Sequence, residues 1–141
     1  MKKITLTILV LLAGTGLILS ACASTANPVD LSGTSWTLVS YGPAGKQTPA
    51  AAGIKTSLVF SKDGKVAGNM GCNSYGGNYE VRGGNIVFSQ IISTLMACPE
   101  PQMTQEGTAF QVMNGTVRYL IEGNTMTIYA DNGGNAITLS R

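Results

Sequence analysis

Short β-forming runs separated by turn residues dominate this chain and constrain its fold more than any other feature. Two pairs of runs flank Lys62-Asp63-Gly64 and Gly83-Gly84, which are strong β-hairpin signals. In Thr125–Ala130, Met126, Ile128 and Ala130 alternate with more polar neighbours, as in a strand with one buried face. The repeated hairpins predict an antiparallel meander that is closed or nearly closed into a barrel. The expected strands are Ser35–Tyr41, Thr56–Phe60, Lys65–Asn69, Asn78–Arg82, Asn85–Phe88, Thr116–Ile121, Thr125–Ala130 and Ala136–Leu139.

One segment, Pro99–Asn114, departs from the β pattern and predicts a single helix. Its prolines suit a first helical turn, Glu100 suits the positive end of the helix dipole, and Asn114-Gly115 is a good stop. Gly107 and Thr108 weaken the middle, so we expect one helix of about three turns that starts late or frays. An apolar stripe at near-helical spacing would face the core, and it consists of Met103, Phe110 and Met113. The Ala-, Pro- and Gly-rich segment 42–53 is expected to be a surface loop.

The N-terminal residues have the order of an export signal. Lys2 and Lys3 form a positive segment, an apolar run follows over Ile4–Leu19, and Leu19-Ser20-Ala21 leads directly into Cys22. This ending resembles the bacterial lipobox, which implies cleavage before Cys22, diacylglycerol on its thiol and an acylated N-terminus. The alternative is an uncleaved transmembrane helix, because the run approaches the minimum spanning length.

The lipobox divides the chain into a signal peptide (residues 1–21), a lipidated tether (residues 22–30) and one folded domain (residues 31–141). Two or more acyl chains would hold Cys22 on a membrane permanently. Ala23 and Ser24 follow without an aspartate beside the cysteine, and by resemblance to the enterobacterial sorting rule this implies the outer membrane. We therefore expect a monomeric lipoprotein on the periplasmic face of the outer membrane.

The charge of the mature chain is balanced. Lys2 and Lys3 account for the net charge of +2, so equal numbers of basic and acidic residues remain after cleavage. Without a basic run, the chain has no footprint for nucleic acid. It has no histidine, which excludes His-based triads, His-ligated zinc and His proton shuttles. We expect no metal and no cofactor. Because no acid/base or nucleophile–base constellation is visible, we do not expect an enzyme.

With Cys22 lipidated, only Cys72 and Cys98 remain as thiols. In an oxidising compartment two such thiols are expected to pair where geometry allows, and closing this loop would stabilise the fold by roughly 3–4 kcal/mol. The alternative is two buried free thiols that act as small hydrophobes. A redox-active pair would have the close C-x-x-C spacing that is absent here.

Two segments carry a resemblance to a known family. The first contains Gly71-Cys72-Asn73 followed by Tyr75 and Tyr79, and the second is Thr94-Leu95-Met96-Ala97-Cys98, with Glu106 in the expected helix. Together with the opening Leu31–Trp36, they resemble the META/HslJ-like domain over Leu31 to Leu139. The resemblance implies an all-β, lipocalin-like open barrel with one helix. It also implies an envelope protein associated with heat shock and novobiocin tolerance, without an assigned reaction.

The motif residues are interpreted as structural rather than catalytic, although the glycines of segment 68–79 could suggest a phosphate loop. That loop would need a lysine and a strand-to-helix context, which are missing. We expect Gly71 to allow close backbone passage, Asn73 to cap a turn, and both tyrosines to pack with their hydroxyls on polar partners. We expect Thr94 to bond the backbone at a strand end and Met96 to fill the barrel mouth. Glu106 would either accept from the 71–73 backbone or serve the helix's own surface.

Two function hypotheses remain. The first is a non-enzymatic envelope protein, anchored through Cys22, that contacts proteins of the outer membrane or supports envelope integrity under stress. The second is a binding module that takes a small apolar molecule or lipid tail between the sheet and the helix. The methionines motivate the second hypothesis, because Met-lined surfaces adapt to varied apolar ligands, unless these side chains only fill the core. They are Met70, Met96, Met103, Met113 and Met126.

Overall fold

The computed structural model describes residues 29–141, so the expected signal peptide, the lipidation site Cys22 and most of the tether lie outside the described residues. Within this range no helix is long and apolar enough to cross a membrane. The elements are β1 (Thr34–Pro43), β2 (Thr48–Pro49), β3 (Ser57–Phe60), β4 (Lys65–Asn69), β5 (Ser74–Arg82), β6 (Asn85–Ser93), α1 (Gln102–Val112), β7 (Gly115–Glu122), β8 (Thr125–Tyr129) and β9 (Asn135–Ser140).

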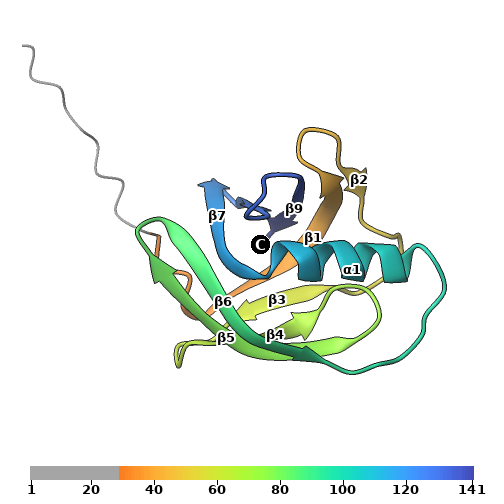
Figure 1. Ribbon diagram of the computed structural model, residues 1–141, viewed down its shortest axis with the longest axis horizontal. Coiled ribbons are helices and arrows are strands. Elements are labelled where there is room, and N and C mark those ends of the chain that lie inside the picture. The colour runs from red at the N-terminus through yellow and green to blue at the C-terminus, as the bar shows by residue number, and fades with distance from the viewer. Residues whose placement is uncertain (1–28) are drawn as a thin grey trace, which may run out of the picture.

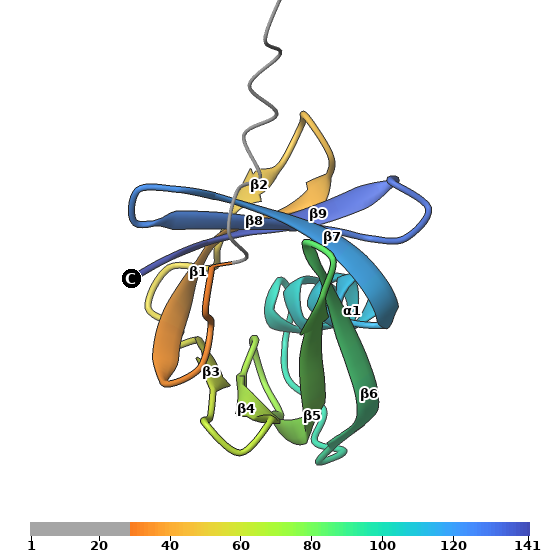
Figure 2. The same cartoon turned by 90° about the vertical axis from the view of Figure 1, so that its left-hand side faces the viewer.

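All strands belong to one antiparallel sheet that closes on itself. The order is β2-β1-β3-β4-β5-β6-β7-β8-β9, and β1 also pairs with β9, so every strand except the short β2 takes part in the ring. Figure 2 looks through this ring and shows α1 on its inner side, while Figure 1 shows the helix near one end of the barrel. The prediction of an antiparallel barrel with one helix is confirmed.

The barrel interior is filled by side chains. Met126 and Ile128 are fully buried, as the alternation of their strand predicts, and Trp36 and Phe60 are the largest of the buried side chains. Around them pack further fully buried residues from the strands and from the positions just after β4 and α1, namely Leu58, Met70, Ile86, Met113, Val117, Ile137 and Leu139. Burial of apolar surface on this scale is the main stabilising contribution to a domain of this size.

Two strands are longer than predicted, and they form the arm that carries the site. β5 begins at Ser74 rather than Asn78, and β6 continues to Ser93 rather than ending at Phe88. A β-bulge interrupts their pairing, where Gly77 faces two residues of β6 and Gln90 takes a positive φ of 54°. Gly77 is required there because a Cβ atom would lie 3.1 Å from the Cα of Ile91. A short strand, β2, also lies within the segment expected to be only loop.

The helix begins at Gln102, three residues later than predicted, and runs through Gly107 without a break. Its buried face differs from the predicted stripe, because Met103 and Phe110 are only half-buried. The buried face consists instead of Gln105, Glu106, Ala109 and Val112, followed by Met113. The helix packs against β1 and β9. Tertiary contacts of this face therefore outweigh the low helix propensity of Gly107.

Candidate functional site

A disulfide ties together the two motif segments. Cys72 lies between β4 and β5, Cys98 lies between β6 and α1, and their Cα atoms are 5.9 Å apart across the bond. The pairing predicted from the cysteine count is therefore confirmed, and the free-thiol alternative is wrong. The bond fixes the loop that leads from β6 into the helix.

Glu106 is the centre of a buried polar network. Its side chain comes from α1 and is only 4% exposed. Its Oε2 accepts hydrogen bonds from the backbone N–H groups of Cys72, at 2.8 Å, and Asn73, at 2.5 Å. Its Oε1 accepts from Nδ2 of Asn73 at 2.7 Å. Of the two roles expected for Glu106, the structure has the first, acceptance from the 71–73 backbone. The carboxylate stabilises a turn whose N–H groups would otherwise be buried without partners.

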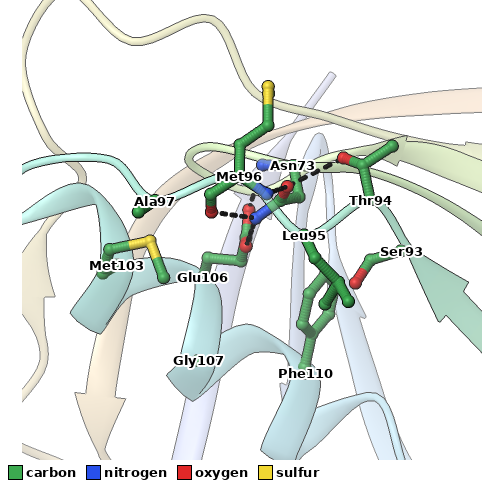
Figure 3. A pocket seen from close by; sticks show the side chains of 10 residues that line it. All are labelled: Asn73, Ser93, Thr94, Leu95, Met96, Ala97, Met103, Glu106, Gly107 and Phe110. Carbon is green, nitrogen blue, oxygen red and sulfur yellow. Dashed lines mark hydrogen bonds between the residues drawn. The ribbon is translucent and has the colours of Figure 1, made fainter.

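The Asn73 side chain extends this network to the loop after β6, as Figure 3 shows. Its Oδ1 accepts from the Thr94 hydroxyl at 2.8 Å and from the Met96 N–H at 2.7 Å, and its Nδ2 donates to the Met96 carbonyl at 3.2 Å. The expectation that Asn73 caps its own turn is wrong. Asn69 has that role, because its Oδ1 accepts from the Gly71 N–H and its Nδ2 donates to the Cys72 carbonyl.

Thr94 also differs in detail from its expected role. Its backbone N–H donates to the Ser74 carbonyl at 3.0 Å, which continues the pairing of β5 with β6, whereas its hydroxyl donates to a side chain, that of Asn73. Both contacts hold the exposed Thr94 at the end of the β6 strand, so that the following loop leaves the sheet in a fixed direction.

Gln105 is a site residue that the sequence reasoning missed. It is fully buried, its Oε1 accepts from the Ala51 N–H at 2.7 Å, and its Nε2 donates to the Met70 carbonyl at 2.6 Å. Gln105 therefore connects the helix to two loops that are far apart in the sequence. Its spacing of four and seven residues from Ala109 and Val112 was the available signal, since such positions lie on the same face of a helix.

Gly71 allows the helix to approach the turn closely, as expected. A Cβ atom at this position would lie 2.5 Å from the carbonyl oxygen of Gln102 and 3.3 Å from the Cβ of Glu106. Any larger residue would therefore push the first turn of α1 away from the network. The close approach is what brings the Glu106 carboxylate within reach of the 72–73 backbone.

The two motif tyrosines anchor β5 to the two ends of β3. The Tyr75 hydroxyl donates to the Ser57 carbonyl at 3.3 Å, and the Tyr79 hydroxyl donates to the Ser61 carbonyl at 3.0 Å. Burial raises the pKa of the Tyr75 phenol above its ordinary value, and it also raises the pKa of Tyr79. Both hydroxyls therefore serve as neutral donors, as the sequence suggested.

Beside the network lies an open groove of about 400 Å³ between α1 and the end of β6. Its lining is mainly apolar, with Leu95 and Phe110 on one side and Met103 on the other (Figure 3). The expectation that Met96 fills the barrel mouth is wrong, because its side chain is 56% exposed and points away from the groove. Leu95 is 97% exposed and Ile92 is 74% exposed, so apolar side chains gather on the surface here. Among residues 29–141, no group of three or more His, Cys, Asp and Glu side chains could hold a metal ion.

Comparison with known proteins finds a family pattern that covers the barrel and both motif segments. The sequence pattern of the META domain matches residues 29–141, which include both motif segments and the whole barrel. The chain belongs to the META domain family. No curated protein matches the chain in sequence.

Solved structures share the fold of this META domain. An NMR structure of a protein from Burkholderia xenovorans is 26% identical, with a TM-score of 0.65, and the match covers 79% of this chain and 83% of that one. A crystal structure of a DUF4847 family protein from Bacteroides vulgatus is 12% identical, with a TM-score of 0.58, and covers 78% and 93%. At this identity the second likeness concerns the fold alone.

Proposed function

We propose that this META domain protein is a non-enzymatic lipoprotein of the outer membrane, anchored through Cys22, that supports envelope integrity or stress tolerance through contacts with other proteins. The observation that carries the proposal is the exposed apolar surface at the end of β6. Leu95 is 97% exposed, although the network of Asn73 and the disulfide of Cys98 hold its loop in place. A fixed loop that presents apolar side chains to solvent is typical of a protein-interaction surface.

The state of the motif's polar groups supports a role without catalysis. Catalysis needs a nucleophile with a base, or an acid/base pair with access to substrate. Here both oxygens of the Glu106 carboxylate accept hydrogen bonds from groups of the turn, and both the oxygen and the nitrogen of the Asn73 amide are hydrogen-bonded. These groups are therefore engaged in holding the loop that carries Leu95.

The membrane anchor rests on the lipobox and is tested separately. Cells that express the full chain would be labelled with radioactive palmitate, and the protein would be followed by its mass and by membrane fractionation. We expect label in the wild type, none in Cys22→Ser, and recovery of the wild type with the outer membrane. An unlabelled wild-type protein in the soluble fraction would overturn the anchor.

The proposed role is tested by deleting the protein's gene. The deletion strain should be more sensitive to heat and to bulky antibiotics such as novobiocin, and the wild-type chain should restore tolerance. The Cys22→Ser chain should restore less, because it is not anchored. Unchanged sensitivity to heat, to novobiocin and to other envelope stresses would contradict the proposal.

A second candidate function is the binding of a small apolar molecule or lipid tail, which the groove between sheet and helix favours. A volume of about 400 Å³ lies within the range of small-molecule sites. Of the five methionines, however, Met70, Met113 and Met126 are fully buried and fill the core. Native mass spectrometry of the protein, with thermal shifts in the presence of fatty acids, decides between the two. Retained lipid or a clear stabilisation would favour this function, and ligand-free spectra without a shift would exclude it.

A further inference from the structure

The far end of β6 has a free edge. β6 pairs with β5 along its whole length, from Asn85 to Ser93, but with β7 only from Asn85 to Phe88. Beyond Phe88 the next segment in space is α1, which runs beside the groove rather than in the sheet. The last five residues of β6 therefore have a strand neighbour on one side only.

The direction of the free backbone groups follows from the hydrogen bonds between β5 and β6. Thr94 donates its N–H to the Ser74 carbonyl, so its backbone faces β5. Residues of an antiparallel strand alternate in the edge to which they direct their N–H and C=O groups. Ser93 therefore directs its N–H and C=O away from β5, towards the side where no strand lies.

The Asn73 side chain continues this pattern beyond the end of β5. It accepts from the Met96 N–H and donates to the Met96 carbonyl, which are the two bonds that a strand residue would make. Thr94 and Met96 thus both face the β5 side, and Leu95 between them directs its backbone to the free side. The network gives the chain a free strand edge that extends from Ser93 to Leu95.

The chemistry of the groove limits what can lie beside this edge. Glu106 is the one charged residue in the lining, and its oxygens already accept hydrogen bonds from the turn. An entering side chain would contact Leu95, Phe110 and Met103, which favours an uncharged apolar group. An occupant that satisfies both features has an extended backbone and apolar side chains at alternate positions.

The chain's own tether does not fit this edge. The described chain begins near the turn between β5 and β6 (orange in Figures 1 and 2), whereas the free edge lies where β6 ends. A nine-residue strand spans about 30 Å. The seven residues from Cys22 to the start of the described chain span at most about 25 Å. This reach is shorter than β6, so a segment of another protein fits the free edge better than the tether does.

We propose that the free edge of Ser93–Leu95 binds an extended segment of a partner protein, which adds as a strand beside β6 and places an apolar side chain in the groove next to α1. The β-bulge at Gln90 supports this assignment, because bulges bend a strand and commonly lie next to functional sites. This inference rests on the proposed function and specifies the chemistry of the partner.

The test uses the full lipidated chain, purified in detergent, and a phage-displayed library of random twelve-residue peptides. We expect selected peptides to have apolar residues at alternate positions. Ser93→Pro removes the outward N–H without touching the bonds to β5, and Pro is tolerated at strand edges. It should weaken binding by at least tenfold, about 1.4 kcal/mol, whereas the matched Ser93→Ala should stay within threefold.

A second measurement leaves the protein unchanged, in case Ser93→Pro disturbs its folding. N-methylation of alternate peptide residues should abolish binding in one register and spare it in the other, because only one set of N–H groups faces the strand. The proposal is overturned if no peptide is selected, if both registers bind equally, or if the two Ser93 variants bind alike. A dimer in sedimentation that Ser93→Pro dissociates would also overturn it, since the occupant would then be a second copy.

Failure of this inference can be told apart from failure of the proposed function. A Ser93→Pro chain that folds and fully restores tolerance in the deletion strain overturns strand addition, while the proposed envelope role stands. A deletion without any phenotype overturns the envelope role, while peptide binding in vitro is judged by the two measurements above.

Discussion

Exchange of the buried carboxylate for an amide, Glu106→Gln, is the most informative perturbation of the network. The side chain keeps its shape, and one amide oxygen can still accept from the N–H groups of Cys72 and Asn73. The new NH₂ group, however, stands where Oε1 accepted from Asn73 Nδ2 at 2.7 Å, so that two donors face each other. Asn73 cannot rotate its amide, because its Oδ1 already accepts from Thr94 and Met96.

The magnitude follows from the bonds that change. A hydrogen bond to a charged group contributes about 1.5–3 kcal/mol, and an unsatisfied buried donor costs a similar amount. One bond of Glu106 is lost and two become neutral, so Glu106→Gln should lower the free energy of unfolding by about 2–4 kcal/mol. Glu122→Gln, at an exposed position of β7, should change it by less than about 0.5 kcal/mol.

A charge swap tests the same reasoning more strictly. Asn73→Asp alone places a second carboxylate against Glu106 and should destabilise by about 3 kcal/mol or more. In the double variant Asn73→Asp/Glu106→Gln, the new amide donates to the new carboxylate, and the Thr94 and Met96 bonds to Oδ1 remain. The coupling energy should therefore be favourable by about 2 kcal/mol, although the bond to the Met96 carbonyl is lost.

The assay is equilibrium urea unfolding at neutral pH without reductant, followed by tryptophan fluorescence, because Trp36 is the sole tryptophan and lies in the core. Two results would show that the Glu106 carboxylate does not stabilise the turn in this way. One is a Glu106→Gln protein within about 0.5 kcal/mol of the wild type, and the other is a double variant whose loss equals the sum of the single losses.

Three further outcomes follow from the structure. A thiol-reactive mass tag should add nothing at Cys72 or Cys98 before reduction and two tags after it, and the double Cys→Ala variant should lose about 3.5 kcal/mol of stability, since the linked positions are 26 residues apart. Gly71→Ala should lower stability by about 2–3 kcal/mol, because its Cβ would meet the helix backbone. Gly107→Ala has open space around it and should raise stability by about 0.5–1 kcal/mol. Equal effects of the two variants in thermal melts would contradict this packing. Burial raises the pKa of Tyr75, so the folding stability that its neutral phenol contributes is fully present below pH about 10 and is lost as pH rises towards the folded-state pKa. Alkaline unfolding should therefore be less steep in Tyr75→Phe, and an unchanged dependence of stability on pH would contradict this.

The barrel was predictable because its signals are local. Turn residues such as Gly83-Gly84 and the alternation around Met126 and Ile128 determine hairpins and their buried faces without reference to distant contacts. The extension of β5 back to Ser74 was not predictable in this way. Its Gly76-Gly77 pair has low strand propensity, and the strand exists because β4 and β6 lie on either side.

The motif residues were recognisable, but their partners were not. A buried Glu and a buried Gln on one helix contradict the usual hydrophobic pattern, so the sequence favoured Met103 and Phe110 as the buried stripe. The burial of Glu106 and Gln105 depends on hydrogen-bond partners more than thirty residues away in the chain, at Cys72 and Met70. The exposure of Met96 likewise follows from the Asn73 contact, which orients its backbone and leaves its side chain in solvent.

We infer that the apolar surface after β6 acts by contacting another protein, and complementation of the deletion strain measures this role in the cell. Leu95→Gln removes the most exposed apolar side chain of this surface, and Leu120→Gln makes the same change at a 49% exposed position on β7. With equal membrane levels and thermal midpoints, Leu95→Gln should fail to restore tolerance to heat and novobiocin, and Leu120→Gln should restore it fully. Full restoration by Leu95→Gln would show that this surface is not the site of the contact.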